Sequence, residues 1–181
     1  LGLRENTLVI FLGDNGTGVD ITSRFKGEIY PGGKGRSNAR GTHVPLIANW
    51  PGRVPAGAIN GDLIGSTDFL PTLLEAAGAR LPEDYPGDGV SFYPQLIGRQ
   101  GRPREALYAW YASDGGSVAK WEFAMSTRHK LYRDGSFFDL GADPWEQKPL
   151  KTDALTGEAA AAARTLQAEL DRLRKPALPI A

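Results

Sequence analysis

An acid and an amide directly follow an apolar run near the start of the chain. The stretch "TLVIFL" (7–12) is apolar on both faces, as in a buried strand of a parallel or mixed sheet, and "GDNG" then places Asp14 and Asn15 between two glycines. A carboxylate and an amide oxygen at the carboxyl end of a strand suit Ca²⁺ or Mg²⁺. Asn-Gly is equally a strong hairpin signal. These residues alone leave a metal site and a hairpin loop both open.

A lysine with small neighbours comes next, Lys34 in "PGGKG" (31–35). The phosphate-binding P-loop pattern fails here. Counted from Gly27, Gly33 stands where that pattern needs lysine, and if Lys34 is taken as the lysine, Gly35 stands where serine or threonine is needed. Such a lysine can reach an anion in a cleft, although a solvated surface lysine is the plainer alternative. His43 stands alone before an apolar strand, and a lone histidine is more often structural than catalytic.

The composition excludes several classes of function. The 181 residues contain 21 Lys and Arg against 21 Asp and Glu, so no excess charge favours nucleic acid or an anionic membrane. No apolar stretch approaches the roughly 20 residues that a membrane-spanning helix needs. The absence of cysteine excludes disulfides and a cysteine nucleophile within these residues. With no initiator Met and no signal-peptide pattern, we expect a segment of a longer protein.

Patterning predicts an α/β portion followed by a smaller antiparallel portion. Strands are expected at 7–12 and 44–51, separated by a long loop at 13–45. A helix is expected at 66–79, with Ser66 or Thr67 as its cap, Asp68 at its positive end and Gly78 closing it.

The second half of the chain is expected to hold a small sheet and a helix. A Pro- and Gly-rich connector runs to residue 104, and "ALYAWYAS", "WEFAMSTRHKLYR" and "SFFDL" then predict an antiparallel meander with a turn at "RDGS". The terminal helix, 156–174, has an apolar stripe that should lie across that sheet: Ala159, Ala162, Ala163, Leu166, Leu170 and Leu173. We therefore expect two domains, 1–104 and 105–181.

The order of these motifs resembles the C-terminal portion of the type I sulfatases, of the alkaline-phosphatase-like superfamily. The resemblance runs over about residues 1–150 through "NTLVIFLGDNG", "GGKG", "GTHVPLIANWPG", "STDFLPTLLEAAG", "DGVSFYPQLIG", "KLYRDGSFFDL" and "ADPWEQKPL". It implies the C-terminal part of the catalytic α/β domain over 1–104, and over 105–181 a small antiparallel sheet packed on a C-terminal helix.

The resemblance also assigns roles to the residues above. It makes Asp14 and Asn15 metal ligands, usually to Ca²⁺ with Mg²⁺ as an alternative, and Lys34 a catalytic residue that contacts the sulfate group of the substrate. The family's nucleophile, a formylglycine made from Cys or Ser in [CS]-x-[PA]-x-R, has no matching motif here and is expected upstream. The segment alone is therefore expected to turn over nothing.

The chain departs from the family pattern at two places. The acidic residue that usually precedes Thr-Arg-Val-Pro is missing from "NARGTHVP" (38–45), where His43 stands in place of Arg, and His43 is not taken as catalytic. Pro149 replaces the Asn usual after the "DP-x-E" turn.

The resemblance implies an enzyme that hydrolyses sulfate esters of small molecules or carbohydrates, with no nucleic acid partner. Two alternatives stay open: a phosphodiesterase or phosphonate hydrolase of the same superfamily, and a non-catalytic binding module derived from a sulfatase. A periplasmic or secreted location follows from the resemblance only. Substrate identity and oligomeric state are not indicated.

Overall fold

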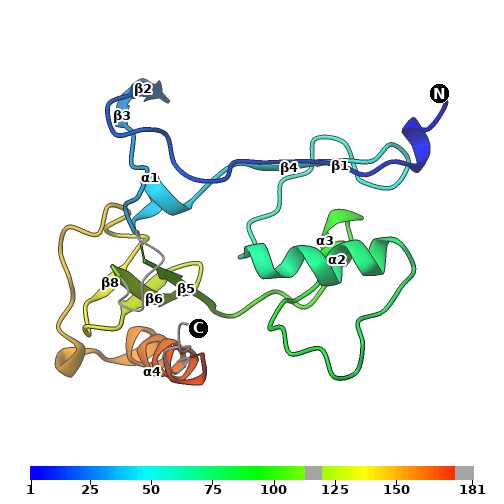
Figure 1. Ribbon diagram of the computed structural model, residues 1–181. Helices are drawn as coiled ribbons and strands as arrows, with labels where there is room; N and C mark the ends of the chain where they lie inside the picture. Colours follow the sequence, from blue (N-terminus) through cyan, green and yellow to red (C-terminus); the bar gives the residue numbers. More distant parts are fainter. Residues whose placement is uncertain (113–119, 174–181) are drawn as a thin grey trace, which may run out of the picture. The chain divides into compact units, whose positions relative to one another are not determined.

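Two units make up the part of the chain that the computed structural model describes, residues 1–112 and 120–173 (Figure 1). The first unit comprises Leu1–Asp14 and Val44–Arg104, and the second comprises Asn15–His43 and Glu105–Ala181. The units divide between Arg104 and Glu105, and residues 15–43 group with the C-terminal residues. The division into domains at 104 and 105 stays a prediction.

In the first unit, strand β1 (Val9–Leu12) pairs antiparallel with β4 (Leu46–Asn49), in the register Val9 opposite Asn49 and Leu12 opposite Leu46. The hairpin interpretation of "GDNG" is therefore wrong, because the partner of β1 lies some 35 residues further along the chain. The expected burial of this strand is also wrong within the described residues. The two strands form a sheet of their own, and Phe11 is 59% exposed. A short 3-10 turn, η1 (Arg4–Asn6), precedes them, and Trp50 Nε1 donates to its Glu5 carbonyl at 2.8 Å.

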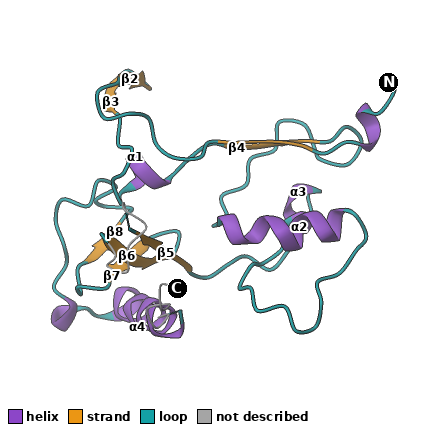
Figure 2. Ribbon diagram, viewed as in Figure 1, coloured by secondary structure: helices purple, strands orange, loops and turns teal. Residues whose placement is uncertain are grey.

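The predicted helix at 66–79 is present as a 3-10 turn, η2 (Ser66–Asp68), followed by α2 (Phe69–Ala76) (Figure 2). Gly78 closes it with φ of 72°, as expected. The predicted caps are wrong, because neither Ser66 nor Thr67 caps α2 through its side chain. A short helix that the sequence did not indicate, α3 (Tyr93–Leu96), follows Phe92, which meets Phe69 edge-on at 5.5 Å.

The Asp68 carboxylate ties the start of α2 to the end of the unit instead of facing solvent. It accepts from Gly65 N at 2.8 Å and from Val90 N at 2.7 Å, and it forms an ion pair with Arg104. The side chains of Asp68 and Arg104 are 2% and 7% exposed. Breaking a buried pair of this kind leaves a charge in a medium that solvates it poorly.

In the second unit, residues 15–43 fold into a short hairpin and a short helix where the sequence predicted one long loop. Strands β2 (Thr22–Phe25) and β3 (Glu28–Pro31) form a hairpin whose turn residues, Lys26 and Gly27, both have positive φ. This is the conformation that two-residue hairpin turns require. Helix α1 (Ala39–Thr42) follows, and the Asn38 side chain accepts from Arg40 N at 3.2 Å at its start.

Backbone hydrogen bonds join the two ends of this segment at glycine residues. Gly16 N donates to Gly41 O at 3.0 Å, and the Gly33 and Lys34 amides both donate to Thr17 O at 2.9 Å. A Cβ on Gly16 would lie 1.9 Å from Arg40 O, and one on Gly33 would lie 2.4 Å from Arg40 Cβ. Only glycine permits backbones to approach so closely.

The predicted meander and terminal helix complete the second unit. Strands β5 (Leu107–Tyr111), β6 (Trp121–Met125), β7 (His129–Tyr132) and β8 (Phe137–Asp139) form an antiparallel sheet in that order. Helix α4 (Gly157–Arg172), preceded by the turn η3 (Thr152–Ala154), packs on β6 and β7 (Figure 1). Residues 113 and 174, at the ends of the expected first strand and helix, lie outside the described residues.

The core between sheet and helix is small and apolar. It consists of Ala124, Leu131, Phe137, Leu166 and Leu170, with Ala159, Ala162 and Ala163 packed against it. The predicted helical stripe is therefore confirmed through Leu170, and Leu173 is half-buried just beyond the helix. No helix among the described residues has the length and apolar character to cross a bilayer.

The ion pair in the first unit can be tested with two nearby arginines. Arg104→Ala is expected to lower the free energy of unfolding by about 3–5 kcal/mol, because Asp68 stays buried without its counter-charge. Arg102→Ala, at an exposed position two residues away, is expected to change it by less than about 0.5 kcal/mol. Urea unfolding followed by near-ultraviolet circular dichroism measures both. Equal effects would contradict the structure.

The glycine contacts of the second unit give another prediction. Gly16→Ala is expected to destabilise the protein by about 1–3 kcal/mol or more, because the new methyl group overlaps the Arg40 carbonyl. Gly61→Ala is the control, since its Cβ would meet nothing within 4 Å. Thermal unfolding of the two variants checks this, and an unchanged midpoint for Gly16→Ala would refute the close approach.

Candidate functional site

Asp14 and Asn15 lie directly after the carboxyl end of β1. Gly13 N donates to Pro45 O at 3.1 Å, which extends the β1–β4 ladder by one residue, and the chain leaves the ladder at Asp14. Asp14 is exposed and Asn15 is half-buried. Asp14 is the last residue of this part of the first unit, and Asn15 begins the second. Both side chains therefore follow the strand end, as the sequence predicted.

Lys34 is held by its backbone close to Thr17, two residues after Asn15. Its amide and that of Gly33 share the Thr17 carbonyl, and Arg36 N donates to Gly33 O at 2.9 Å. Within its own unit, Lys34 is exposed and forms an ion pair with no carboxylate of the described residues. The structure thus brings the Lys34 backbone next to residues 15–17, and the ammonium group is available to an anion.

The donor chemistry of Asp14 and Asn15 fits a hard cation but supplies only part of a coordination shell. Ca²⁺ takes six to eight oxygen ligands, of which these side chains can provide about two or three. Over residues 1–112 and 120–173, no group of three or more His, Asp or Glu side chains is placed to hold a metal. Any cation bound through Asp14 and Asn15 therefore needs further ligands from substrate, water or other residues.

His43 takes no part in this arrangement. It is exposed at the end of α1, where its amide donates to Ala39 O at 3.0 Å. The neighbouring Arg40 packs instead on Trp145, its guanidinium carbon 4.1 Å from the ring centroid, and Trp145 meets Tyr30 edge-on at 5.4 Å. Arg40 therefore attaches α1 to the turn after β8.

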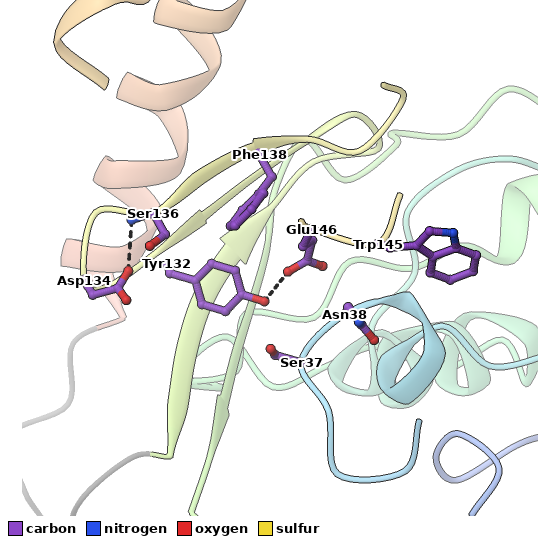
Figure 3. A pocket seen from close by; sticks show the side chains of 8 residues that line it. All are labelled: Ser37, Asn38, Tyr132, Asp134, Ser136, Phe138, Trp145 and Glu146. Carbon is purple, nitrogen blue, oxygen red and sulfur yellow. Dashed lines mark hydrogen bonds between the residues drawn. The ribbon is translucent and has the colours of Figure 1, made fainter. Parts of the chain in front are cut away.

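A second polar cluster, which the sequence did not reveal, lies beside the segment that follows Lys34. Lys130 is 1% exposed, and its Nζ lies 2.9 Å from Glu146 Oε1 and 3.7 Å from the centroid of the Phe123 ring. The Lys130 ammonium also donates to the Ser37 carbonyl, and the Tyr132 hydroxyl donates to Glu146. Tyr132, Glu146, Ser37 and Asn38 line a hollow of about 250 Å³. Figure 3 shows the side chains that line it, with the Tyr132 hydroxyl bonded to Glu146.

Burial is the largest cause of the pKa shifts of two groups in this cluster. It lowers the pKa of Lys130, and the Glu146 carboxylate opposes that shift. Burial, followed by the hydrogen bond to Glu146, raises the pKa of the Tyr132 hydroxyl far above its ordinary value. At neutral pH Tyr132 is thus a neutral donor. The sequence offers little indication of this cluster, because Lys130 and Tyr132 occupy alternate positions of a strand, as polar residues on a solvated strand face also do.

Comparison with known proteins identifies the family. A family model described as "N-sulphoglucosamine sulphohydrolase, C-terminal" matches residues 38–176. Human arylsulfatase A is 37% identical over 149 residues, which cover 80% of this chain and 29% of that protein. The crystal structure of the PsFucS1 sulfatase from Pseudoalteromonas sp. matches with a TM-score of 0.73 and 25% identity, covering 99% of this chain and 40% of that one.

A further solved structure, that of BT4656 in complex with its substrate D-glucosamine-2-N,6-O-disulfate, matches with a TM-score of 0.63 and 23% identity. The match covers 94% of this chain and 34% of that one. The chain spans about a third of the length of the curated relatives that it matches. Its strands, small antiparallel sheet and terminal helix thus correspond to the C-terminal part of a larger fold. On the family model and these identities, the chain belongs to the sulfatases of the alkaline-phosphatase-like type.

Proposed function

We propose that the protein containing this chain hydrolyses sulfate esters, and that Asp14, Asn15 and Lys34 contribute to its active site. One structural observation carries the assignment of residues. The backbone amide of Lys34 is bonded to the carbonyl of Thr17, two residues after Asn15, in a chain that belongs to the sulfatase family. A cation and two oxygen ligands in one short segment suit an anionic ester whose charge grows during cleavage.

Each of the three residues has a distinct role in this proposal. The Asp14 carboxylate and the Asn15 amide oxygen would hold a divalent cation, Ca²⁺ or Mg²⁺, the first by charge and the second as a neutral ligand. Such a cation polarises an ester oxygen when it is bound. Lys34 would bind the sulfate oxygens as a point charge and stabilise them as negative charge builds there.

The nucleophile of the reaction belongs to other residues. Formylglycine is made from Cys or Ser within a defined motif, and this chain has no cysteine and no such motif. We therefore assign the chain the binding and electrostatic part of catalysis and place formylglycine upstream.

The substrate class in this proposal is a sulfated carbohydrate or small molecule. The structural likeness to BT4656, which was solved with a sulfated glucosamine, supports a sugar. The polar hollow beside Ser37 and Asn38, lined also by Tyr132, Asp134 and Trp145, adds hydroxyl, carboxylate and aromatic groups of the kind that contact sugars.

The role of Lys34 can be tested in the complete enzyme with para-nitrophenyl sulfate. Lys34→Ala is expected to lower kcat/KM by roughly 10²–10³-fold, the usual effect of removing one charge-stabilising contact. Lys26→Ala removes an exposed lysine of the β2–β3 turn and should leave kcat/KM unchanged. Hydrolysis of the matching phosphate ester, without hydrolysis of the sulfate, would refute the proposal.

The metal ligands can be tested without measuring turnover. Asp14→Ala is expected to weaken Ca²⁺ affinity by more than about 10-fold. Loss of a residue that only supports a metal ligand already weakens affinity by about 10-fold or more, and Asp14 would be a direct, charged ligand. Isothermal calorimetry on chelator-treated protein measures this change. Asp20→Ala, at another exposed aspartate of the same segment, is the control. Equal Ca²⁺ affinity of the Asp14 variant and the unsubstituted protein would exclude Asp14 as a ligand.

A further inference from the structure

We propose that Lys130, Tyr132 and Glu146 act as positioning residues for Lys34, by clamping the Ser37–Asn38 segment against the C-terminal sheet. The inference rests on the proposed function in that it takes Lys34 to be the sulfate-binding lysine. It concerns residues of β7 and of the turn after β8, which lie 96 to 112 positions after Lys34.

The clamp is built around one buried hydrogen bond. The Lys130 ammonium donates to the carbonyl of Ser37, three residues after Lys34. Its counter-charge, Glu146, is 2.9 Å away, and the side chains of Lys130 and Glu146 are 1% and 6% exposed. Charge-assisted bonds that are shielded from water are stronger than neutral ones. The Ser37 carbonyl is thus held at a defined place on the sheet.

Glu146 is delivered to this position by an ordered turn. The Asp143 carboxylate accepts from Gln147 N at 2.6 Å and from Lys148 N at 2.7 Å, and Glu146 itself adopts a φ of 58°. A non-glycine residue in this left-handed region is strained, and such strain persists only where the surroundings over-determine it. The Tyr132 hydroxyl holds the second carboxylate oxygen, as Figure 3 shows.

Short, tight links carry the position of Ser37 to Lys34 on one side and to α1 on the other. The turn closed by Arg36 N and Gly33 O separates Lys34 from Ser37, and Gly33 and Lys34 are bonded to Thr17. On the other side, Asn38 caps α1, and Arg40 stacks on Trp145, the residue preceding Glu146. The segment 33–42 is therefore attached at both ends and clamped in the middle. Loss of the middle contact should let Lys34 shift, and a displacement of about 1 Å can reduce catalysis on the order of 10²-fold.

The test compares single and double substitutions in the complete enzyme. Lys130→Met removes the cation and the donor to Ser37, and it leaves Glu146 buried without its partner. Lys130→Met combined with Glu146→Gln removes both charges, which buried pairs often tolerate without loss of stability. Lys148→Met, at an exposed lysine in the same turn, is the control. For each variant, hydrogen exchange of the Gly41, Thr42 and His43 amides is compared with that of α4 amides.

The expected result is local. In the double variant, exchange at residues 41–43 should accelerate at least about 10-fold while α4 stays protected, and kcat/KM for para-nitrophenyl sulfate should fall on the order of 10²-fold. Acceleration in both places, or in neither, would overturn the clamp. Full activity in the double variant would also overturn the clamp, because the Lys130–Glu146 pair would then contribute only to stability and not to the position of Lys34.

Hydrogen exchange also distinguishes failure of this inference from failure of the proposed function. If the unsubstituted enzyme hydrolyses no sulfate ester, the proposed function fails. The effect on residues 41–43 still decides whether the clamp orders the segment that contains Lys34.

Discussion

The second unit depends on one cation that is almost completely withheld from water. Lys130 would be costly to bury alone, since desolvation disfavours its charged form. It is compensated by the Glu146 carboxylate, the Ser37 carbonyl and the faces of two aromatic rings, those of Phe123 and Tyr132. These partners come from three separate stretches of the chain. The Lys130 ammonium thus contacts aromatic rings of the sheet, the carboxylate of the turn after β8 and a carbonyl of the segment that contains Lys34.

Two glycines, Gly16 and Gly33, permit close main-chain contacts around the segment that contains Lys34. Gly16 and Gly33 let three stretches of backbone meet at distances that exclude a Cβ, so their amides can bond to Gly41 and Thr17. These main-chain bonds restrict the backbone at Gly16, Gly33 and Lys34, and the contact from Lys130 to Ser37 restricts the residues that follow. The candidate sulfate-binding lysine therefore sits on a base of main-chain hydrogen bonds, and its own side chain stays available for an anion.

Periodicity predicted the elements that have one apolar face, and it failed where the stabilising partners are distant in sequence. The stripe of α4 could be predicted directly, because Leu166 and Leu170 bury the expected face. The antiparallel meander was likewise predicted, from its apolar strands and the turn between them. Asp68 was expected at the positive end of the helix, and its buried ion pair was not predicted because the partner, Arg104, lies 36 positions away. The β2–β3 hairpin was missed because its strands bury no side chain fully. Local patterning made Asp14, Asn15 and Lys34 candidates but left the alternatives open, since no local pattern distinguishes a ligand from a solvated polar residue, and their roles came from the family resemblance.

The backbone of Glu146 has a consequence for anyone who evolves or redesigns this protein. An L-residue at φ of 58° pays a conformational penalty of roughly 1–2 kcal/mol that glycine would avoid. Glycine at this position would also remove the carboxylate that balances buried Lys130, and breaking a buried ion pair costs about 3–5 kcal/mol, more than the backbone strain that glycine would relieve. Stability and turnover therefore select for the same residue at position 146. Libraries ranked on heat tolerance and libraries ranked on activity should both retain glutamate there.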